Sequence, residues 1–220
     1  MKPILFNTEM VRAIIDGRKT VTRRVIKVPT SYDKIGIKKN SKSVMFDECG
    51  EYMVNREEKY FFLSDKWKEV KFPCHIGDIL YIRETWQTWY DEIVDVMKYC
   101  YYEDMIRRNV VFTEEEDEPI KWKPSIHMPK EAARIFLKVT GVRVERLQAI
   151  NTRDHNELFW EGYPYGFSDH EGIPPIQLFE KLWDSTVKDD QYKWKSNPWV
   201  WVIEFERCEK PEFGNDVDNG

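Results

Sequence analysis

The segment DGRKTVTRRVIK, from Asp16 to Lys27, concentrates side chains whose types and spacing suit chemistry. A threonine hydroxyl becomes a nucleophile when a neighbouring group removes its proton, and a neutral lysine amine can do so. The segment holds Lys19, Thr20, Thr22 and Arg24, and a guanidinium can hold an oxyanion or a phosphate. The segment therefore fits a solvated basic edge strand, a phosphate clamp or the catalytic edge of a pocket.

The residues around Gly17 predict a helix followed by a strand. In NTEMVRAIIDG, residues 7–17, Asn7 or Thr8 can cap the first turn, the apolar residues form one stripe, and Gly17 ends the helix. The run after Gly17 is rich in β-branched residues, which favours a strand. A short helix therefore delivers the chain into the basic strand.

Strand geometry decides how these groups can meet. Side chains alternate along a strand, so Thr20, Thr22 and Arg24 share one face. Lys19 would fall on the opposite face of an ideal strand. We therefore expect Lys19 to lie in a polar turn after Gly17, curled back towards Thr22, because glycine adopts such a turn at little cost.

The rest of the chain predicts short strands and few helices. Strands are predicted in GDILYIRETW (77–86), in ARIFLKVTGVRVERL (133–147), read as a strand pair that Gly141 breaks or bulges, and in PWVWVIEFERCE (198–209). Helices are predicted in TRDHNELFWEG (152–162) and IQLFEKLWDSTV (176–187). This pattern predicts an α+β fold, with a small β-barrel that carries short helices on its rim.

Two stretches look like insertions into this fold. Residues 31–73 are polar and rich in lysine, with a possible hairpin in EYMVNREEKYFFL, and residues 87–122 contain the acidic run TEEEDE, expected to be a solvated loop. Strands resume after each excursion, so we expect one domain over 1–210. The tail, 211–220, has nothing to bury and is expected to be mobile.

Length and composition narrow the function classes. A chain of 220 residues is long enough for one domain with a full core. A net charge of −5 argues against wrapping a long nucleic acid by charge alone, although a basic pocket for one nucleotide remains compatible. The chain holds 9 Trp, 11 Tyr and 12 Phe, so some aromatic rings can line a pocket that stacks on a flat ligand.

The same sequence predicts a cytoplasmic protein without a metal or cofactor. No apolar run approaches the ~18 residues of a membrane span, and MKPILFNTEM lacks the apolar region of a signal peptide. The four cysteines are far apart, without a CxxC pair, and are expected to be reduced thiols. The spacing of His155, Asp169 and His170 does not fit metal ligation.

Five stretches, in this order, resemble the ASCH family, and in particular its larger members from phages and prophages. They are DGRKTVTRR, GDILYIRETW, KPSIHMPKEAARIFLKVTGVRVERLQAI, WEGY and NPWVWVIEF. The resemblance covers most of the chain outside the two excursions. It implies a β-barrel similar to the PUA fold and an association with RNA. A compact bacterial member of the family is an amidohydrolase that removes the acetyl group from N4-acetylcytidine.

The resemblance also implies roles for particular residues. Lys19 and Thr22 match the catalytic lysine and threonine of the compact enzyme, Glu161 matches its glutamate, and Arg24 matches the arginine that follows the motif. The segment between LQAI and WEGY is longer here than in that enzyme, so Glu157 competes with Glu161 for the role.

Four further residues are candidates for substrate binding. Arg83 and Glu84 follow a predicted strand and form either a cross-strand ion pair or part of the pocket. Trp86 can be a stacking wall or a core residue, and His127 lies within a stretch that carries the resemblance.

Three functions are therefore compatible with the sequence. The first is a metal-free amidohydrolase that acts on an N-acylated pyrimidine nucleoside such as N4-acetylcytidine. The second is a module that binds RNA or a modified nucleoside without chemistry, and the third is a ribonuclease that uses the same basic pocket. The ligand is a nucleoside or RNA in every case, and the oligomeric state stays open.

Overall fold

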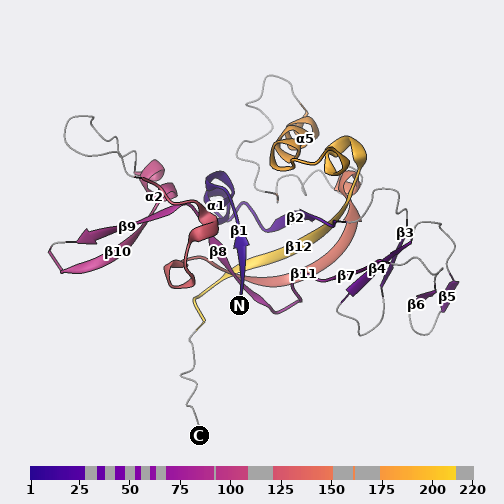
Figure 1. The fold of residues 1–220 in the computed structure, drawn as a ribbon, viewed down its shortest axis with the longest axis horizontal. Coiled ribbons are helices and arrows are strands. Elements are labelled where there is room, and N and C mark those ends of the chain that lie inside the picture. Colours follow the sequence, from indigo (N-terminus) through magenta and orange to yellow (C-terminus); the bar gives the residue numbers. More distant parts are fainter. Residues whose placement is uncertain are drawn as a thin grey trace, which may run out of the picture.

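The computed structural model describes residues 1–27, 34–37, 43–47, 53–55, 60–62, 68–91, 93–108, 121–150, 161 and 174–211. These residues form a mixed α+β fold that is rich in strands, in agreement with the class predicted from the sequence (Figure 1).

A five-stranded sheet forms the centre of the fold. Its strands lie in the order β1-β8-β11-β12-β2, and only the pairing of β1 with β8 is parallel. The strands are β1 (Lys2–Leu5), β8 (Ile79–Arg83), β11 (Phe136–Arg146), β12 (Trp199–Cys208) and β2 (Val21–Val25). Segments from both ends of the sequence thus meet in one sheet, which places β2 beside β12.

The predicted helix over 7–17 is α1 (Thr8–Ile15). The side chain of Asn7 caps it by accepting a hydrogen bond from the Met10 N–H at 2.8 Å. Gly17 follows with a φ of +74°, a left-handed conformation that glycine adopts without the penalty a Cβ would bring. The chain therefore turns sharply between α1 and β2.

Strand β11 corrects one expectation. The sequence suggested a strand pair over 133–147, whereas the structure has one long strand with a shift in register between Val139 and Gly141. A β-bulge absorbs the irregularity, so the ladder with β12 continues on both sides of it. Gly141 also leaves room for a neighbour, because a Cβ there would lie 2.4 Å from Glu204 Oε2.

Apolar clusters cover both faces of the sheet. Along β12, Trp201, Ile203 and Phe205 belong to the cluster that contains Val11 and Ile14 of α1. The alternate residues Val200 and Val202 belong to a second cluster with Phe179 and Trp183, from α5 (Pro175–Thr186). The central strands are therefore buried on two sides, and a charged group on either face needs a partner.

The edge strands β1 and β2 lie close to each other through side chains. Arg24 Nη2 of β2 donates to the Leu5 carbonyl at the end of β1, at 2.6 Å. The ring of Phe6, the next residue, lies 6.3 Å from that of Phe205. The described strands have no hydrogen-bonded ladder between β1 and β2. The sheet is therefore curved, with its two edges bridged by Arg24.

The first excursion contains two small sheets. One has the order β3-β4-β7, and the other is the predicted hairpin, formed by β5 and β6. Val70 and Phe72, at its end, pack against the α1 side of the core, with the Phe72 ring 4.8 Å from that of Trp201. The strands are β3 (Lys34–Ile37), β4 (Ser43–Asp47), β5 (Met53–Asn55), β6 (Tyr60–Phe62) and β7 (Lys68–Lys71).

The second excursion begins with a hairpin of β9 (Trp86–Asp91) and β10 (Val96–Tyr101), followed by α2 (Tyr102–Arg107). Figure 1 shows the hairpin projecting from the central sheet, with α2 beside α1. Short 3-10 turns complete the described elements, namely η1 (Ser125–His127), η2 (Lys130–Ala132), η3 (Leu147–Ala149), η4 (Asp190–Tyr192) and η5 (Trp194–Ser196).

Several expectations fall outside the described residues. They are the helix over 152–162 apart from Glu161, the acidic run TEEEDE, and the tail beyond residue 211. Within the described chain, no helix combines the length and the apolar character that crossing a bilayer requires.

Candidate active site

The turn at Gly17 places Lys19 just before β2. The backbone N–H groups of Arg18 and Lys19 both donate to the Ala13 carbonyl, at 2.8 and 3.0 Å. These two hydrogen bonds to the last turn of α1 fix the chain as it reverses direction. Lys19 follows this turn and pairs with Glu161 in an isolated antiparallel β-bridge, so its backbone lies beyond the turn in which strand alternation had led us to expect it.

The Lys19 side chain is buried. Its Nζ donates to the Val21 carbonyl at 2.7 Å, to the Glu161 carbonyl at 2.7 Å and to Glu161 Oε2 at 2.8 Å. An ammonium has three N–H donors, and these three oxygens use all of them. The expected position in a polar turn was wrong for this side chain, which is 0% exposed because Glu161 covers it.

Glu161 is held by two cations. Oε2 accepts from Lys19, and Oε1 accepts from Arg23 Nη1 at 2.6 Å. Burial raises the pKa of the Glu161 carboxyl, but the charges and hydrogen bonds of Lys19 and Arg23 outweigh burial and hold this pKa below its usual value. Glu161 is therefore ionised at neutral pH.

Lys19 is shifted towards its neutral form. Burial lowers the pKa of its amine, and the charges of Arg24 and Arg23 lower it further, against the opposing effect of Glu161. A buried lysine near two arginines can therefore lose its proton more easily than a lysine in water.

Thr22 and Arg24 lie on the face of β2 that points to the α1 side of the core. Their partners in the register are Ile203 and Trp201, which belong to that cluster. Thr22 is buried, and among the described contacts no hydrogen bond joins it to Lys19. The candidate nucleophile and base are thus three residues apart in the sequence, and no described hydrogen bond joins them.

Phe6 lines the same region. The Arg24 guanidinium carbon lies 5.2 Å from the centre of the Phe6 ring, and Lys19 Nζ lies 5.9 Å from it. An aromatic face attracts both cations. Phe6 therefore contacts the two positively charged candidates from one side, and the sequence did not single it out.

Arg23 was also missed by the sequence reasoning. It points to the opposite face of β2 from Thr22, with a side chain that is 1% exposed. The signal was present in alternation, because Val21 and Val25, on the same face as Arg23, pack against the α5 cluster. A cation on a covered face requires a carboxylate, and Glu161 is such a partner.

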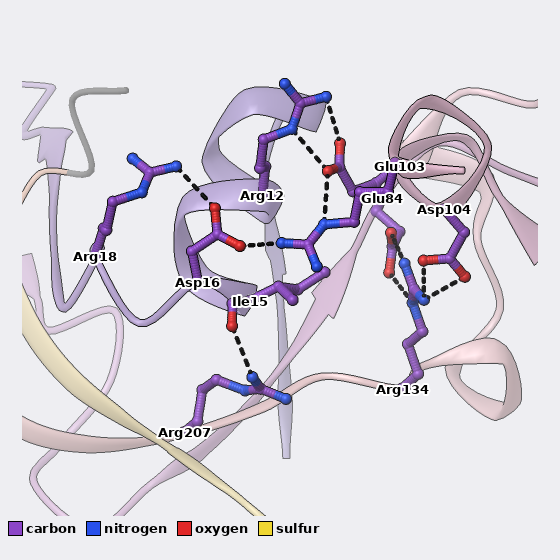
Figure 2. Close-up of polar contacts among 10 residues, drawn as sticks. Arg12, Ile15, Asp16, Arg18, Glu84, Glu103, Asp104, Arg134 and Arg207 are labelled. Carbon is purple, nitrogen blue, oxygen red and sulfur yellow. Dashed lines mark hydrogen bonds and ion pairs between the residues drawn. The ribbon is translucent and has the colours of Figure 1, made fainter. Parts of the chain in front are cut away.

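Arg83 and Glu84 lie in a different environment. Arg83 Nη1 donates to the Ile126 carbonyl at 3.1 Å. Both oxygens of the buried Glu84 accept from Arg134, at 2.9 Å each, and Arg134 also binds Asp104 of α2 at 2.7 Å (Figure 2). Glu84 thus takes part in an ion pair that fastens α2 to the rest of the fold.

Trp86 and His127 lie near Arg83 and Glu84. Trp86 is buried in an apolar cluster with Met128 and Phe136, and Lys123 Nζ lies 4.8 Å from the centre of its ring. His127 is exposed in η1. In the described contacts, none of the four predicted substrate-binding residues from 83 to 127 bonds to Lys19 or Glu161.

A second buried carboxylate links α1 to α2. Glu103, which is 1% exposed, accepts from Arg12 Nε at 2.8 Å and from Arg107 Nε at 3.2 Å. Arg107 and Arg18 also pair with Asp16, at the end of α1 (Figure 2). We call Arg12, Glu103 and Arg107 the α1–α2 latch.

The described residues contain no group of three or more His, Cys, Asp or Glu side chains that could hold a metal ion. Glu157, His155, Asp169 and His170 lie outside these residues. Comparison of the chain with protein-family models, with curated proteins and with solved structures finds no match. The site is therefore characterised by its own geometry, which is a buried Lys–Glu–Arg cluster beside a buried threonine.

Proposed function

We propose that this protein is a metal-independent amidohydrolase that acts on an N-acylated pyrimidine nucleoside such as N4-acetylcytidine. One observation carries the proposal. Lys19 and Glu161, which the resemblance to the ASCH family implies as catalytic, form an ion pair at 2.8 Å whose side chains are 0% and 8% exposed, and Lys19 lies just before the strand that holds Thr22. The resemblance selected these two residues from the sequence alone, although they lie 142 positions apart.

The first step in this mechanism is the activation of Thr22. Neutral Lys19 accepts the proton of the Thr22 hydroxyl as its oxygen attacks the acetyl carbonyl carbon. Burial and the nearby arginines favour the neutral amine. In the resting arrangement all three Lys19 N–H groups are donated, so the amine must lose one proton and turn its lone pair towards Thr22.

The second step is the collapse of the tetrahedral intermediate. The carbon–nitrogen bond breaks, the proton held by Lys19 passes to the departing amine of cytidine, and an acetyl ester remains on Thr22. Water, deprotonated by Lys19, then attacks this ester, Lys19 returns that proton to the departing Thr22 oxygen, and acetic acid is released. Arg24 is the candidate donor to the oxyanion, because it borders Lys19 over the Phe6 ring.

A PUA-like barrel in a single domain over 1–210 is part of the same proposal. The contact of Arg24 with the Leu5 carbonyl brings the two edges of the sheet together, as a small barrel requires. Phe72 and Glu103 attach the two excursions to the core and to α1. We further propose a cytoplasmic protein whose partner is a nucleoside or RNA.

One observation favours a second candidate, a module that binds the nucleoside or RNA without chemistry. Lys19 has no N–H group left over, which suits a permanent ion pair that shapes a pocket wall. In that case Arg24 would contact the ligand, and Thr22 would only pack against its neighbours in the core.

The deciding experiment incubates the purified protein with N4-acetylcytidine and follows cytidine and acetate by chromatography. We expect release by the wild type and none by Thr22→Ala, with Thr22→Ser retaining part of the rate because it keeps the hydroxyl. The binding module predicts no release, together with affinity that survives Thr22→Ala and falls with Arg24→Ala. Release by Thr22→Ala at the wild-type rate would remove Thr22 as the nucleophile.

A further inference from the structure

Arg23 contacts the candidate site from the opposite face of β2. It leaves β2 on the face opposite to Thr22, and its Nη1 donates to Glu161 Oε1 at 2.6 Å. Its Nη2 lies 3.9 Å from Glu145 Oε2. Arg23 is thus a buried cation between two carboxylates, of which one belongs to the candidate catalytic pair.

The contacts of Arg23 continue across the sheet. In the register, Arg23 pairs with Val202 and Val202 pairs with Arg143, so the two arginines lie in one row of three strands. Arg143 Nε donates to Glu145 Oε1 at 2.7 Å, and Arg143 also pairs with Glu204. Charges therefore alternate from the buried site outward through the charge row, which is Glu161, Arg23, Glu145, Arg143 and Glu204.

From Arg23 outward, the side chains of the row become more exposed. The Glu145 side chain is 4% exposed, whereas that of Glu204, which lies against Gly141, is 42% exposed. Glu145 therefore compensates the buried charge of Arg23, and Arg23 can stay in place without drawing Lys19 away from Glu161.

The two cations on Glu161 differ in one respect. A guanidinium does not lose its proton in proteins, whereas a buried ammonium can. The charged groups that face Lys19 are Glu161, Arg23 and Arg24, and among the cations only the ammonium of Lys19 can lose a proton.

We propose that Arg23 is a positioning residue of the site, because it holds Oε1 of Glu161 from the far face of β2 and leaves Oε2 to Lys19. The proposal rests on the proposed function and deepens it, since it names the residue that keeps the lysine close to its working state. Arg23 keeps Glu161 ionised and oriented, and its charge also disfavours the ammonium form of Lys19.

A purely structural role is the alternative, in which Arg23 only neutralises a buried acid. The α1–α2 latch offers a matched control, because Arg12 is likewise one of two cations on a buried carboxylate. In both Arg23→Gln and Arg12→Gln, the carboxylate keeps its second cation. A general loss of stability would appear in both variants, whereas a change in the Lys19 pKa would appear only in Arg23→Gln.

The experiment measures the pKa of Lys19 by NMR in protein labelled with ¹³C at the lysine ε-carbon, with the Lys19 signal identified by its absence in Lys19→Met. We expect Arg23→Gln to raise this pKa by about one unit, which lowers the neutral fraction, and the rate at pH 7, about tenfold. Arg23→Lys, which keeps the cation, should restore most of the difference. Arg12→Gln should leave the Lys19 pKa unchanged.

The proposal is overturned if Arg23→Gln leaves the Lys19 pKa unchanged or lowers it, or if Arg12→Gln raises it equally. If Arg23→Gln does not fold, Arg23→Gln/Glu145→Gln removes one charge of each sign from the interior and should still raise the pKa; no rise would count equally against it. If the Lys19 pKa rises in Arg23→Gln but the wild type never releases cytidine, only the proposed function is refuted. If the wild type releases cytidine but the Lys19 pKa does not rise in Arg23→Gln, only the role of Arg23 is refuted.

Discussion

Glu161 and Glu103 are both buried carboxylates held by two cations, but the cations differ. Glu103 lies between Arg12 and Arg107, whose side chains are 36% and 38% exposed. Glu161 lies between Arg23 and Lys19, whose side chains are 1% and 0% exposed. The first cluster is a fixed set of charges at a surface, and it joins two helices. The second contains one cation that can release a proton, and burial brings that release closer to neutral pH.

The comparison teaches that burial of an ion pair does not by itself mark an active site. The latch buries its carboxylate more completely than the candidate site does, because the Glu103 side chain is 1% exposed and that of Glu161 is 8% exposed. What sets the candidate site apart is a titratable cation, Lys19, whose Nζ donates to the Val21 carbonyl beside the hydroxyl-bearing Thr22. A replacement that exchanges these properties should therefore affect the two clusters differently.

The largest effect is expected for Lys19→Met in the candidate site. This variant keeps the length of the side chain but removes the base, and losing a general base typically costs about 10²–10⁴ in rate. Breaking the buried pair should also lower the free energy of unfolding by about 3 kcal/mol, since Glu161 keeps only Arg23. Cytidine release per folded molecule, with the folded fraction taken from urea unfolding, measures both. Turnover that survives the replacement would exclude Lys19 as the base.

A smaller effect is expected for Glu103→Gln in the latch. Arg12 and Arg107 would then face each other across a neutral amide, so the free energy of unfolding should fall by about 1–3 kcal/mol. The rate of cytidine release should not change, because the latch does not contact Lys19 or Glu161 in the described structure. Urea unfolding and the same rate assay provide the measurements. A loss of rate comparable with that of Lys19→Met would make the two clusters one functional unit.

The smallest effect concerns stability at alkaline pH. The pKa of Lys19 is lowered in the folded protein by burial, with help from Arg24 and Arg23. Between that pKa and about 10.4, its value in the unfolded chain, the unfolded state binds more protons, so stability rises with pH in this window. Urea unfolding of the wild type and of Lys19→Met across the window should show this rise only in the wild type.

The difference between the two proteins isolates Lys19 from other groups that titrate there. Burial raises the pKa of Cys74 to about 11 and that of Tyr101 to about 12, and both groups are present in either protein. The latch holds no lysine, so Arg12→Gln should leave the alkaline rise intact. On the acid side, Glu161 contributes stability that is complete above its unfolded pKa and is lost as the pH falls through its lowered folded pKa. Parallel curves for the wild type and Lys19→Met would contradict the assigned direction of the Lys19 shift.

Local patterns in the sequence predicted the helices α1 and α5 and four strands of the central sheet, β2, β8, β11 and β12. Asn7 and Gly17 delimit α1, the apolar face of residues 176–187 becomes α5, and Gly141 marks the bulge of β11. These signals act within a few residues, because caps, periodicity and glycine conformations are local properties of the backbone. The strand pair over 133–147 was misread, since a bulge and a break leave the same local signal.

The candidate site was predictable only in part. Strand alternation separated Lys19 from Thr22 and Arg24, and the resemblance selected Glu161. Alternation also placed Lys19 in the turn, whereas the structure has it after the turn, in a bridge with Glu161. Neither indicated that Glu84 forms an ion pair with Arg134 or that Trp86 packs with Met128, because those partners come from distant segments. A polar residue after a strand has the same appearance in a sequence whether it faces a ligand or an ion-pair partner.

By itself, the sequence determined which groups are available for chemistry and how the short elements alternate. Only the tertiary structure decided that Glu161 closes over Lys19, that Arg23 supports this carboxylate from the opposite face of β2, and that Glu103 fastens α2 to α1. The physical reason is that burial and the charges of distant residues set the protonation state of a group, and both arise only when β2, β12 and β11 lie side by side.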